Sequence, residues 1–350
     1  MTVHADFTVR RGDFALRIDA TFAPGEVVAV LGPNGSGKST LLRALAGLER
    51  IDEGTVDVDG RVWESQAACV SPEDRNVGLV FQDYALFPHL SVLDNVAFGL
   101  HARGTSKRDA RTRALDVLRH LGIDALADRR PAAVSGGQAQ RVAVARALVT
   151  QPRLLLLDEP MAALDASTRD EVRVRLAQQL AEFDGCALLV THDPLDAMLL
   201  ADRVLVLEAG HVVQDAPLGE LVAQPATPFV ASLLGTNLLR GHAHDGHITL
   251  DGGGGLAVAD PQLAGPVLAV VRPAAVSVHR THPEGSARNV WPCEVVSVSR
   301  AYDRVRLRLA GAPALVAEVT PAAVADLRLE VGTQVWASVK ATEIDAYPAP

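Results

Sequence analysis

The sequence contains a glycine-rich segment of the kind that binds phosphate groups. Residues 32–39 read Gly-Pro-Asn-Gly-Ser-Gly-Lys-Ser, between an apolar stretch at 27–31 and a stretch with leucines at helical spacing. Glycines let backbone N–H groups wrap a phosphate, and the N-terminus of the following helix adds a favourable dipole. We therefore predict a phosphate-binding loop in which Lys38 reaches the outer phosphates and the Ser39 hydroxyl holds Mg²⁺.

A second chemical signal is a pair of carboxylates at the end of an apolar segment. Asp158 and Glu159 directly follow the four leucines of residues 154–157. Successive side chains of a strand point to opposite faces, so the two carboxylates should have different tasks. Asp158 is suited to binding Mg²⁺, and Glu159 is suited to polarising an attacking water as a general base. Beside a phosphate-binding loop, this pair indicates nucleotide hydrolysis.

These groups must be positioned by alternating strands and helices. Apolar segments of strand length occur at 27–31, 154–157, 187–190 and 204–207, and helical spacing occurs at 39–48, 109–121, 138–149 and 170–183. This alternation is typical of an α/β domain with a largely parallel sheet.

The pattern changes after about residue 239. Short alternating segments follow at 267–271, 290–298, 305–309, 314–319 and 334–340. Turn residues separate them at hairpin-like intervals, which predicts a small all-β, OB-like barrel domain. The run of four glycines at 252–255 is either a flexible linker or a turn inside that barrel.

Length and composition narrow the class of protein. The chain has 350 residues, of which 48% are hydrophobic, and a formal net charge of -9. This length favours two domains, and the apolar fraction excludes wholesale disorder. No uncharged apolar run approaches the roughly 18 residues that a membrane-spanning helix needs. The net acidity argues against a nucleic-acid partner.

Four further segments, met in order along the chain, resemble motifs of the ATP-binding-cassette (ABC) family of transport ATPases. They are the Q-loop glutamine Gln82, the signature motif Ser135-Gly136-Gly137-Gln138, the D-loop Ala163-Leu164-Asp165 and the switch histidine His192. Val134 precedes the signature where leucine is usual, and Ala163 stands where serine or glycine is commoner. The resemblance implies a P-loop NTPase fold over residues 1–235, with a helical subdomain at about 85–150.

The resemblance also implies an ATPase with ATP and Mg²⁺ as ligands. Its catalytic residues are Glu159, His192 and Gln82, and Ser39, Gln82 and Asp158 hold the metal. The nucleotide-binding residues are Gly32, Pro33, Asn34, Gly35, Ser36, Gly37, Lys38, Ser39, Thr40, Asp158, Ser135, Gly136, Gly137, Gln138 and Asp165. Relatives stack adenine on an aromatic residue shortly before the first long strand. Phe14 is the only aromatic nearby, and we assign no stacking residue.

Family membership would place the chain in a larger assembly. The signature motif of one subunit closes over ATP bound by the other in a head-to-tail homodimer. Integral membrane permease subunits form the pore, and residues 84–89 (YALFPH) supply exposed aromatics where such a subunit docks. A periplasmic or extracellular substrate-binding protein joins through the complex, and the ATPase lies at the cytoplasmic face of the cell membrane.

The C-terminal region, 236–350, resembles Mop/TOBE-like molybdate-binding barrels over about 284–347. Ser286-Ala287-Arg288-Asn289 matches their opening, and residues 339–344 (VKATEI) match their closing segment. A tetrahedral dianion is bound by hydroxyl and cationic hydrogen-bond donors in the absence of competing carboxylates, and Ser286, Arg288 and Lys340 can supply such donors. These three residues form the candidate oxyanion site.

The resemblance also bears on the cargo. The insertion at 59–76 looks like its counterpart in molybdate-importer ATPases. The resemblance therefore implies import of molybdate or tungstate, with the oxyanion as a regulatory ligand of the tail. The same machine importing sulfate, ferric iron, polyamine or sugar is an alternative, and so is a soluble ABC ATPase that is not coupled to transport.

Overall fold

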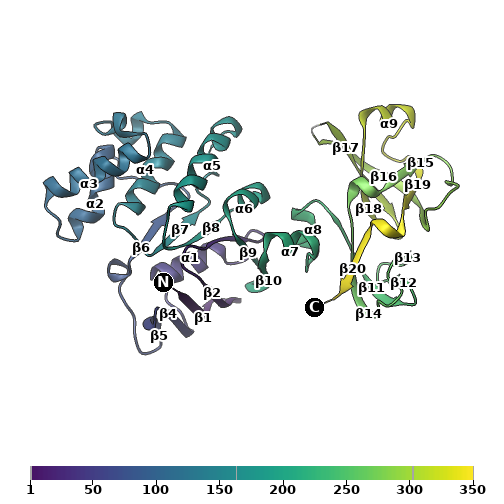
Figure 1. Ribbon diagram of the computed structural model, residues 1–350, viewed down its shortest axis with the longest axis horizontal. Helices are drawn as coiled ribbons and strands as arrows, with labels where there is room; N and C mark the ends of the chain where they lie inside the picture. Colours follow the sequence, from purple (N-terminus) through teal and green to yellow (C-terminus); the bar gives the residue numbers. More distant parts are fainter. Residues whose placement is uncertain (1, 163, 302, 350) are drawn as a thin grey trace. The chain divides into compact units, whose positions relative to one another are not determined.

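The computed structural model describes residues 2–162, 164–301 and 303–349 (Figure 1). The chain divides into two compact units, Met1–Leu218 and Gly219–Pro350. The domain boundary expected at 235 lies farther along the chain, after the short helices α7 (Leu218–Ala223) and α8 (Pro228–Leu233).

A ten-stranded sheet runs through the first unit in the order β5-β4-β1-β2-β10-β9-β3-β8-β7-β6. Its parallel part consists of β9 (Arg203–Glu208), β3 (Val27–Leu31), β8 (Cys186–Val190), β7 (Leu154–Asp158) and β6 (Val77–Val80). All residues of β3 and β8 are buried, which is why their sequences are apolar without alternation. The four strands expected in this part are confirmed.

The rest of this sheet is mainly antiparallel, and the sequence did not predict this part. Antiparallel pairs join β1 to β2, β1 to β4, β4 to β5 and β9 to β10. These strands are β1 (Val3–Arg11), β2 (Phe14–Phe22), β4 (Glu53–Val58), β5 (Arg61–Ser65) and β10 (His211–Pro217). In β1 and β2 buried and exposed residues alternate, as in strands with one face in the core.

Helices flank this sheet. They are α1 (Lys38–Ala46), α2 (Val92–Ala102), α3 (Lys107–His120), α4 (Gly136–Leu148), α5 (Ala166–Ala181) and α6 (Pro194–Leu200), with short 3-10 turns at Pro72–Asp74, Asp124–Leu126 and Pro131–Ala133. Figure 1 shows α2, α3 and α4 gathered away from the antiparallel strands. These three helices share a core that includes Val96, Leu118 and Val142, so they form the expected helical subdomain.

The second unit is built from two five-stranded sheets, ordered β13-β12-β11-β14-β20 and β15-β19-β16-β17-β18. The first contains β11 (Asn237–His244), β12 (His247–Leu250), β13 (Gly255–Ala257), β14 (Gly265–Val271) and β20 (Ile344–Pro348). The second contains β15 (Ser277–His279), β16 (Asn289–Ala301), β17 (Arg304–Gly311), β18 (Leu315–Val319) and β19 (Gln334–Val339). The remaining elements are α9 (Pro321–Asp326) and 3-10 turns at Pro273–Ala275 and Ala341–Glu343.

The two sheets of this unit cover one common core, which confirms the all-β prediction. Asn237 at the start of β11 joins the sheets, because its amide nitrogen donates to the carbonyls of Val271 and Val316. Asn289 joins them again through hydrogen bonds in both directions with Ala257. Gly252, Gly253 and Gly254 of the four-glycine run lie in the turn between β12 and β13, and Gly255 begins β13, so of the two interpretations the turn is the right one. Within the described ranges, no helix combines the length and apolar character needed to cross a bilayer.

Candidate active site

The loop between β3 and α1 has a backbone that only glycine can adopt at two positions. A Cβ atom on Gly32 would lie 2.1 Å from the carbonyl oxygen of Leu207. A Cβ on Gly37, where φ is +106°, would lie 2.8 Å from a methyl group of Leu16. These contacts explain why the glycines of the sequence motif stand where they do.

Lys38 is folded back onto this loop. Its Nζ donates to the carbonyl oxygens of Gly32 and Pro33, both at 2.9 Å, and the residue is only 7% exposed. Burial lowers the pKa of Lys38, while the nearby carboxylates of Glu159 and Asp158 oppose that shift. The loop therefore contains a poorly hydrated cation, which interacts strongly with an anion that enters.

Ser39 and Asp158 lie together beside the loop. The Ser39 hydroxyl donates to the Asp158 carboxylate at 3.2 Å. Burial raises the pKa of Asp158, and the hydrogen bond from Ser39 partly offsets this. Hydroxyl and carboxylate oxygens are the hard ligands that Mg²⁺ prefers, so this pair fits the metal that the sequence implies.

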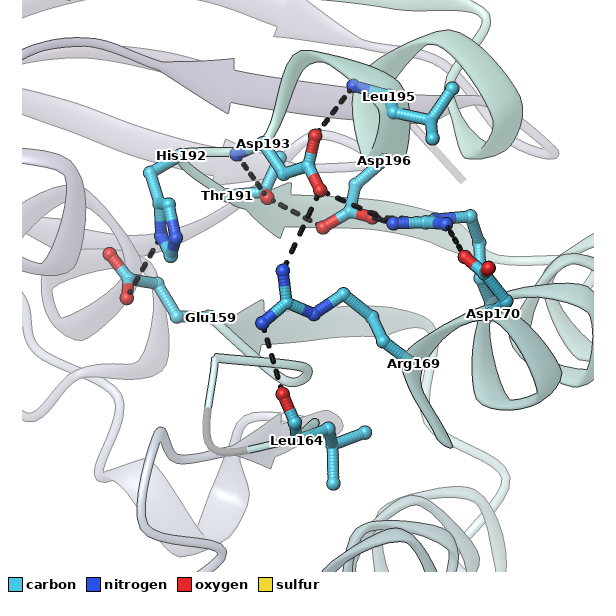
Figure 2. Close-up of polar contacts among 10 residues, drawn as sticks. Glu159, Leu164, Arg169, Asp170, Thr191, His192, Asp193, Leu195 and Asp196 are labelled. Carbon is cyan, nitrogen blue, oxygen red and sulfur yellow. Dashed lines mark hydrogen bonds and ion pairs between the residues drawn. The ribbon is translucent and has the colours of Figure 1, made fainter. Parts of the chain in front are cut away.

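The three expected catalytic residues converge at the carboxyl ends of β6, β7 and β8. Gln82 Nε2 lies 3.4 Å from Glu159 Oε2, and His192 Nδ1 lies 3.5 Å from the same oxygen. Figure 2 shows the His192 ring directed at the Glu159 carboxylate. Glu159 has a positive φ of 46°, so its side chain does not continue the alternation of β7. A left-handed backbone at a carboxylate is costly and is often found at functional sites.

A cavity of about 300 Å³ lies over the phosphate-binding loop and reaches Glu159. Its walls comprise Phe14, Asn34, Gly35, Gly37, Lys38, Ser39, Thr40 and Glu159. Phe14, to which the sequence alone gave no role, is the aromatic residue in this wall. Its place in the cavity depends on the antiparallel pairing of β1 with β2, which was not predicted.

The signature residues build the start of α4. Ser135 is the N-cap, and its side chain and that of Gln138 bond to each other's backbone N–H groups. A Cβ on Gly137 would lie 2.7 Å from Thr168 Cγ2, so this glycine lets α4 and α5 approach closely. Within the described residues, no hydrogen bond joins the signature residues to the loop at 32–39.

The D-loop residue Asp165 caps α5. It accepts hydrogen bonds from the Ser167 hydroxyl at 2.6 Å and the Thr168 N–H at 3.0 Å, and these bonds lower its pKa. Ala163 of the same motif lies outside the described residues. Asp165, like the signature, is therefore held by its own helix rather than by the phosphate-binding loop of this chain.

The candidate oxyanion residues are all exposed. Asn289 of β16 pairs with Val339 of β19, so Arg288 and Lys340 leave the ladder at the same end. Ser286 lies in the bend before β16. In the part of the chain that the structure describes, no hydrogen bond joins any two of these three side chains.

The aromatic segment 84–89 is only partly exposed. Tyr84 is buried, at 8% exposure, which corrects the expectation that it faces a partner. The rings of Phe87 and Phe98 lie 4.6 Å apart, and Phe98 is 46% exposed. Arg146 donates to the carbonyls of Tyr84 and Ala85 and lies over the Phe87 ring. The exposed aromatic surface is therefore formed by Phe87 and Phe98.

Known families and proteins resemble the chain along most of its length. The family of ABC transporters matches residues 16–162, and the TOBE domain matches residues 285–346. The molybdenum import ATP-binding protein ModC of Mycobacterium tuberculosis is 43% identical over 97% of this chain and 95% of its own. The sulfate/thiosulfate import ATP-binding protein CysA of Nitrosomonas europaea is 38% identical, over 93% and 90%.

Solved structures agree with this assignment. The dimeric post-hydrolysis state of the ATP-binding cassette MJ0796, bound to ADP and Pi, is 31% identical, with a TM-score of 0.54. That match covers 62% of this chain and 99% of the cassette. The chain belongs to the family of ABC transporter ATP-binding proteins that carry a TOBE domain.

Proposed function

We propose that this chain hydrolyses ATP to drive the import of molybdate or tungstate. The observation that carries the hydrolysis is the convergence of Glu159, Gln82 and His192 beside Lys38, Ser39 and Asp158. The cargo rests on the 43% identity to a molybdenum import protein, which extends over 97% of the chain and includes the C-terminal unit.

The chemistry follows from the positions of these side chains. Lys38 and the backbone of the loop would bind the outer phosphates. Ser39, Asp158 and Gln82 would hold Mg²⁺, which would supply positive charge to the phosphates. Glu159 orients a water and accepts its proton as general base. His192 and Gln82 lie close enough to the Glu159 carboxylate to set its direction.

The signature motif and Asp165 complete the site of a second copy in this proposal. The support is that both are held away from the phosphate-binding loop of their own chain, and that a related cassette is described as a dimer. Two inactive variants test it, Lys38→Ala and Ser135→Arg. A head-to-tail heterodimer of the two keeps one intact site, so mixing them should restore hydrolysis. A mixture as inactive as its components would contradict the arrangement.

The assembly would include integral membrane permease subunits at the cytoplasmic face of the cell membrane and an external substrate-binding protein. Phe87 and the exposed Phe98 form an aromatic surface on which a permease helix could pack. Replacing Phe98 with Ser should weaken co-purification with the permease and leave basal hydrolysis unchanged.

The oxyanion is proposed to act also as a regulatory ligand of the C-terminal unit at Ser286, Arg288 and Lys340. Calorimetry on the full chain should show that molybdate and tungstate bind and that sulfate does not. Hydrolysis by the assembled transporter should fall when molybdate is added on the cytosolic side. Equal inhibition of an Arg288→Ala variant would overturn this regulatory role.

Sulfate import is the second candidate, favoured by the 38% identity to a sulfate/thiosulfate import protein over 93% of the chain. Measuring the uptake of sulfate and of molybdate in a strain that lacks this protein distinguishes the two candidate functions. Loss of sulfate uptake with intact molybdate uptake would assign the chain to sulfate.

A further inference from the structure

Arg169, in the first turn of α5, bridges the segment that follows Glu159 and the segment that contains His192. Its Nη2 donates to the carbonyl oxygen of Leu164 at 3.0 Å, and its Nη1 lies 3.9 Å from Asp193 Oδ2. Figure 2 shows this guanidinium between the two loops. Because Leu164 directly precedes the D-loop aspartate and Asp193 directly follows the switch histidine, one side chain connects both motifs.

The Asp193 end of this bridge is rigidly held. One carboxylate oxygen accepts the N–H of Leu195 at 2.9 Å, and the other lies 3.2 Å from Nη2 of Arg173. Arg173 is 5% exposed and also donates to the buried carboxylate of Asp196 at 2.7 Å. Asp193 is therefore anchored to a buried ion-pair network.

The residue before the switch histidine belongs to the same network. The Thr191 hydroxyl donates to Asp196 at 2.9 Å and accepts the N–H of Asp193 at 3.1 Å. Thr191 and Asp193, on either side of His192 in the chain, are thus both held by this network. The backbone around His192 is therefore fixed even without Arg169.

The Leu164 end is held by apolar packing rather than by ion pairs, because the side chains of Met161 and Leu164 are buried in the core of the unit. The segment from Glu159 to Leu164 is held by short-range turns, Ala162 N–H to Glu159 O at 3.1 Å and Leu164 N–H to Met161 O at 3.2 Å. A displacement of this segment would carry the Glu159 carboxylate with it. The Glu159 N–H donates to the Val190 carbonyl oxygen at 3.0 Å, which ties the start of this segment to β8. The bond from Arg169 to the Leu164 carbonyl is a second link, at the other end of the segment, to the rigid frame around His192.

The contacts of Arg169 leave part of its guanidinium group without a hydrogen-bond partner among the described residues. The Nε of Arg169 is buried and makes no hydrogen bond to any described residue. The distance of 3.9 Å between Arg169 Nη1 and Asp193 Oδ2 is longer than a hydrogen bond. A buried unpaired donor costs free energy, so such groups are expected where function requires them.

We propose that Arg169 is a positioning residue for ATP hydrolysis. By tying the Leu164 carbonyl to Asp193, it holds the Glu159 carboxylate in its working position relative to His192. The inference rests on the proposed roles of Glu159 and His192, and it assigns Arg169 no contact with the nucleotide.

Steady-state hydrolysis by the full chain tests this. The Arg169→Gln variant should lose on the order of tenfold to a hundredfold in kcat, with KM for ATP within about twofold, because a misplaced group slows chemistry without weakening binding. Arg169→Lys, which keeps the charge and can reach one acceptor, should recover part of the loss. Arg175→Gln is the matched control, since Arg175 lies on the same helix in an exposed pair with Glu171.

A double-mutant cycle tests whether Arg169 acts through Asp193. Asp193→Asn keeps a side chain that can cap α6 but removes the charge that faces Arg169. In that background Arg169→Gln should cost far less than in the wild type, because residues that act through each other are not additive. Equal losses in both backgrounds, a KM that rises as much as kcat falls, or an Arg169→Gln variant within twofold of wild type would overturn the proposal.

Two further measurements keep the outcomes distinct. Thermal unfolding of each variant shows whether it is folded. If Arg169→Gln is unfolded, the hydrolysis rate of Arg169→Lys is used for the test instead. If the wild-type protein fails to hydrolyse ATP, or if Glu159→Gln is as active as the wild type, the proposed function is contradicted rather than the role of Arg169.

Discussion

The nucleotide site and the candidate oxyanion site differ in how much of each is assembled within one chain. At the nucleotide site Lys38 is buried and bonded to its own loop, and Ser39, Asp158 and Glu159 all have polar partners within the unit. Ser286, Arg288 and Lys340 are exposed instead, and only the register of β16 and β19 brings two of them to one end. Charged groups interact strongly only when water is excluded. The nucleotide site is therefore preorganised, whereas the candidate oxyanion site would need a ligand or a second surface to complete it.

The largest effect should come from the base in the preorganised site. Glu159→Gln keeps the size of the side chain but cannot accept a proton. We expect kcat to fall by about 10²–10⁴ with ATP affinity nearly unchanged, because general base catalysis contributes that much. Phosphate release and binding of a fluorescent ATP analogue measure the two quantities. A variant that also loses ATP binding would show that Glu159 helps to build the nucleotide site rather than acting only as its base.

A second test addresses a buried ion pair at the C-terminal end of α1, the helix that begins at the phosphate-binding loop. Arg75 and Glu64 form an ion pair with fully buried side chains, and Arg75 also donates to the carbonyls of Ala44 and Leu45 at the end of α1. Glu64→Gln leaves the Arg75 charge uncompensated and should lower the free energy of unfolding by about 3–5 kcal/mol.

Urea unfolding checks that value, with Glu53→Gln as the control for an exposed pair with Arg10. Surface ion pairs add little, so the control should stay near wild type. Similar losses in both variants would show that burial is not what distinguishes this region.

The third test uses the raised pKa of Asp158. Because burial favours the protonated form, Mg²⁺ binding should weaken as pH falls through a pKa above the ordinary aspartate value. Ser39→Ala removes a hydrogen bond that lowers this pKa, so the pKa measured by carboxyl NMR without Mg²⁺ should move further up. Asp158→Asn should weaken Mg²⁺ binding on the order of tenfold to a hundredfold. A downward shift in Ser39→Ala would contradict the assigned cause.

The smallest effects are expected at the exposed site. Arg288→Ala should weaken molybdate binding about tenfold, the value of a hydrogen bond to a charged group, and Lys340→Ala should weaken it less. Arg240→Ala, at an exposed arginine in the other sheet of the unit, is the control. Calorimetry on the full chain measures all three. A loss as large as that at the nucleotide site would mean that the oxyanion site is also preorganised.

The sequence predicted best those features that depend on neighbouring residues. The loop at 32–39 was expected as found, and so were the strand before it and the helix after it, because glycine conformation and apolar spacing are local properties. The antiparallel strands β1, β2, β4 and β5 were missed. Their alternating pattern was present, but whether a strand pairs parallel or antiparallel depends on partners far along the chain.

The functional residues divide in the same way. Types and spacing alone pointed to Lys38, Asp158 and Glu159, because each belongs to a motif with a chemical reason. That Gln82 and His192 meet at one oxygen of Glu159, that Phe14 reaches the cavity and that Tyr84 is buried were decided by the packing of strands distant in sequence. The bridge from Arg169 to Leu164 and Asp193 is of this kind. Sequence determines which groups can do chemistry, whereas tertiary structure decides which groups meet, because distance and burial set the strength of each interaction.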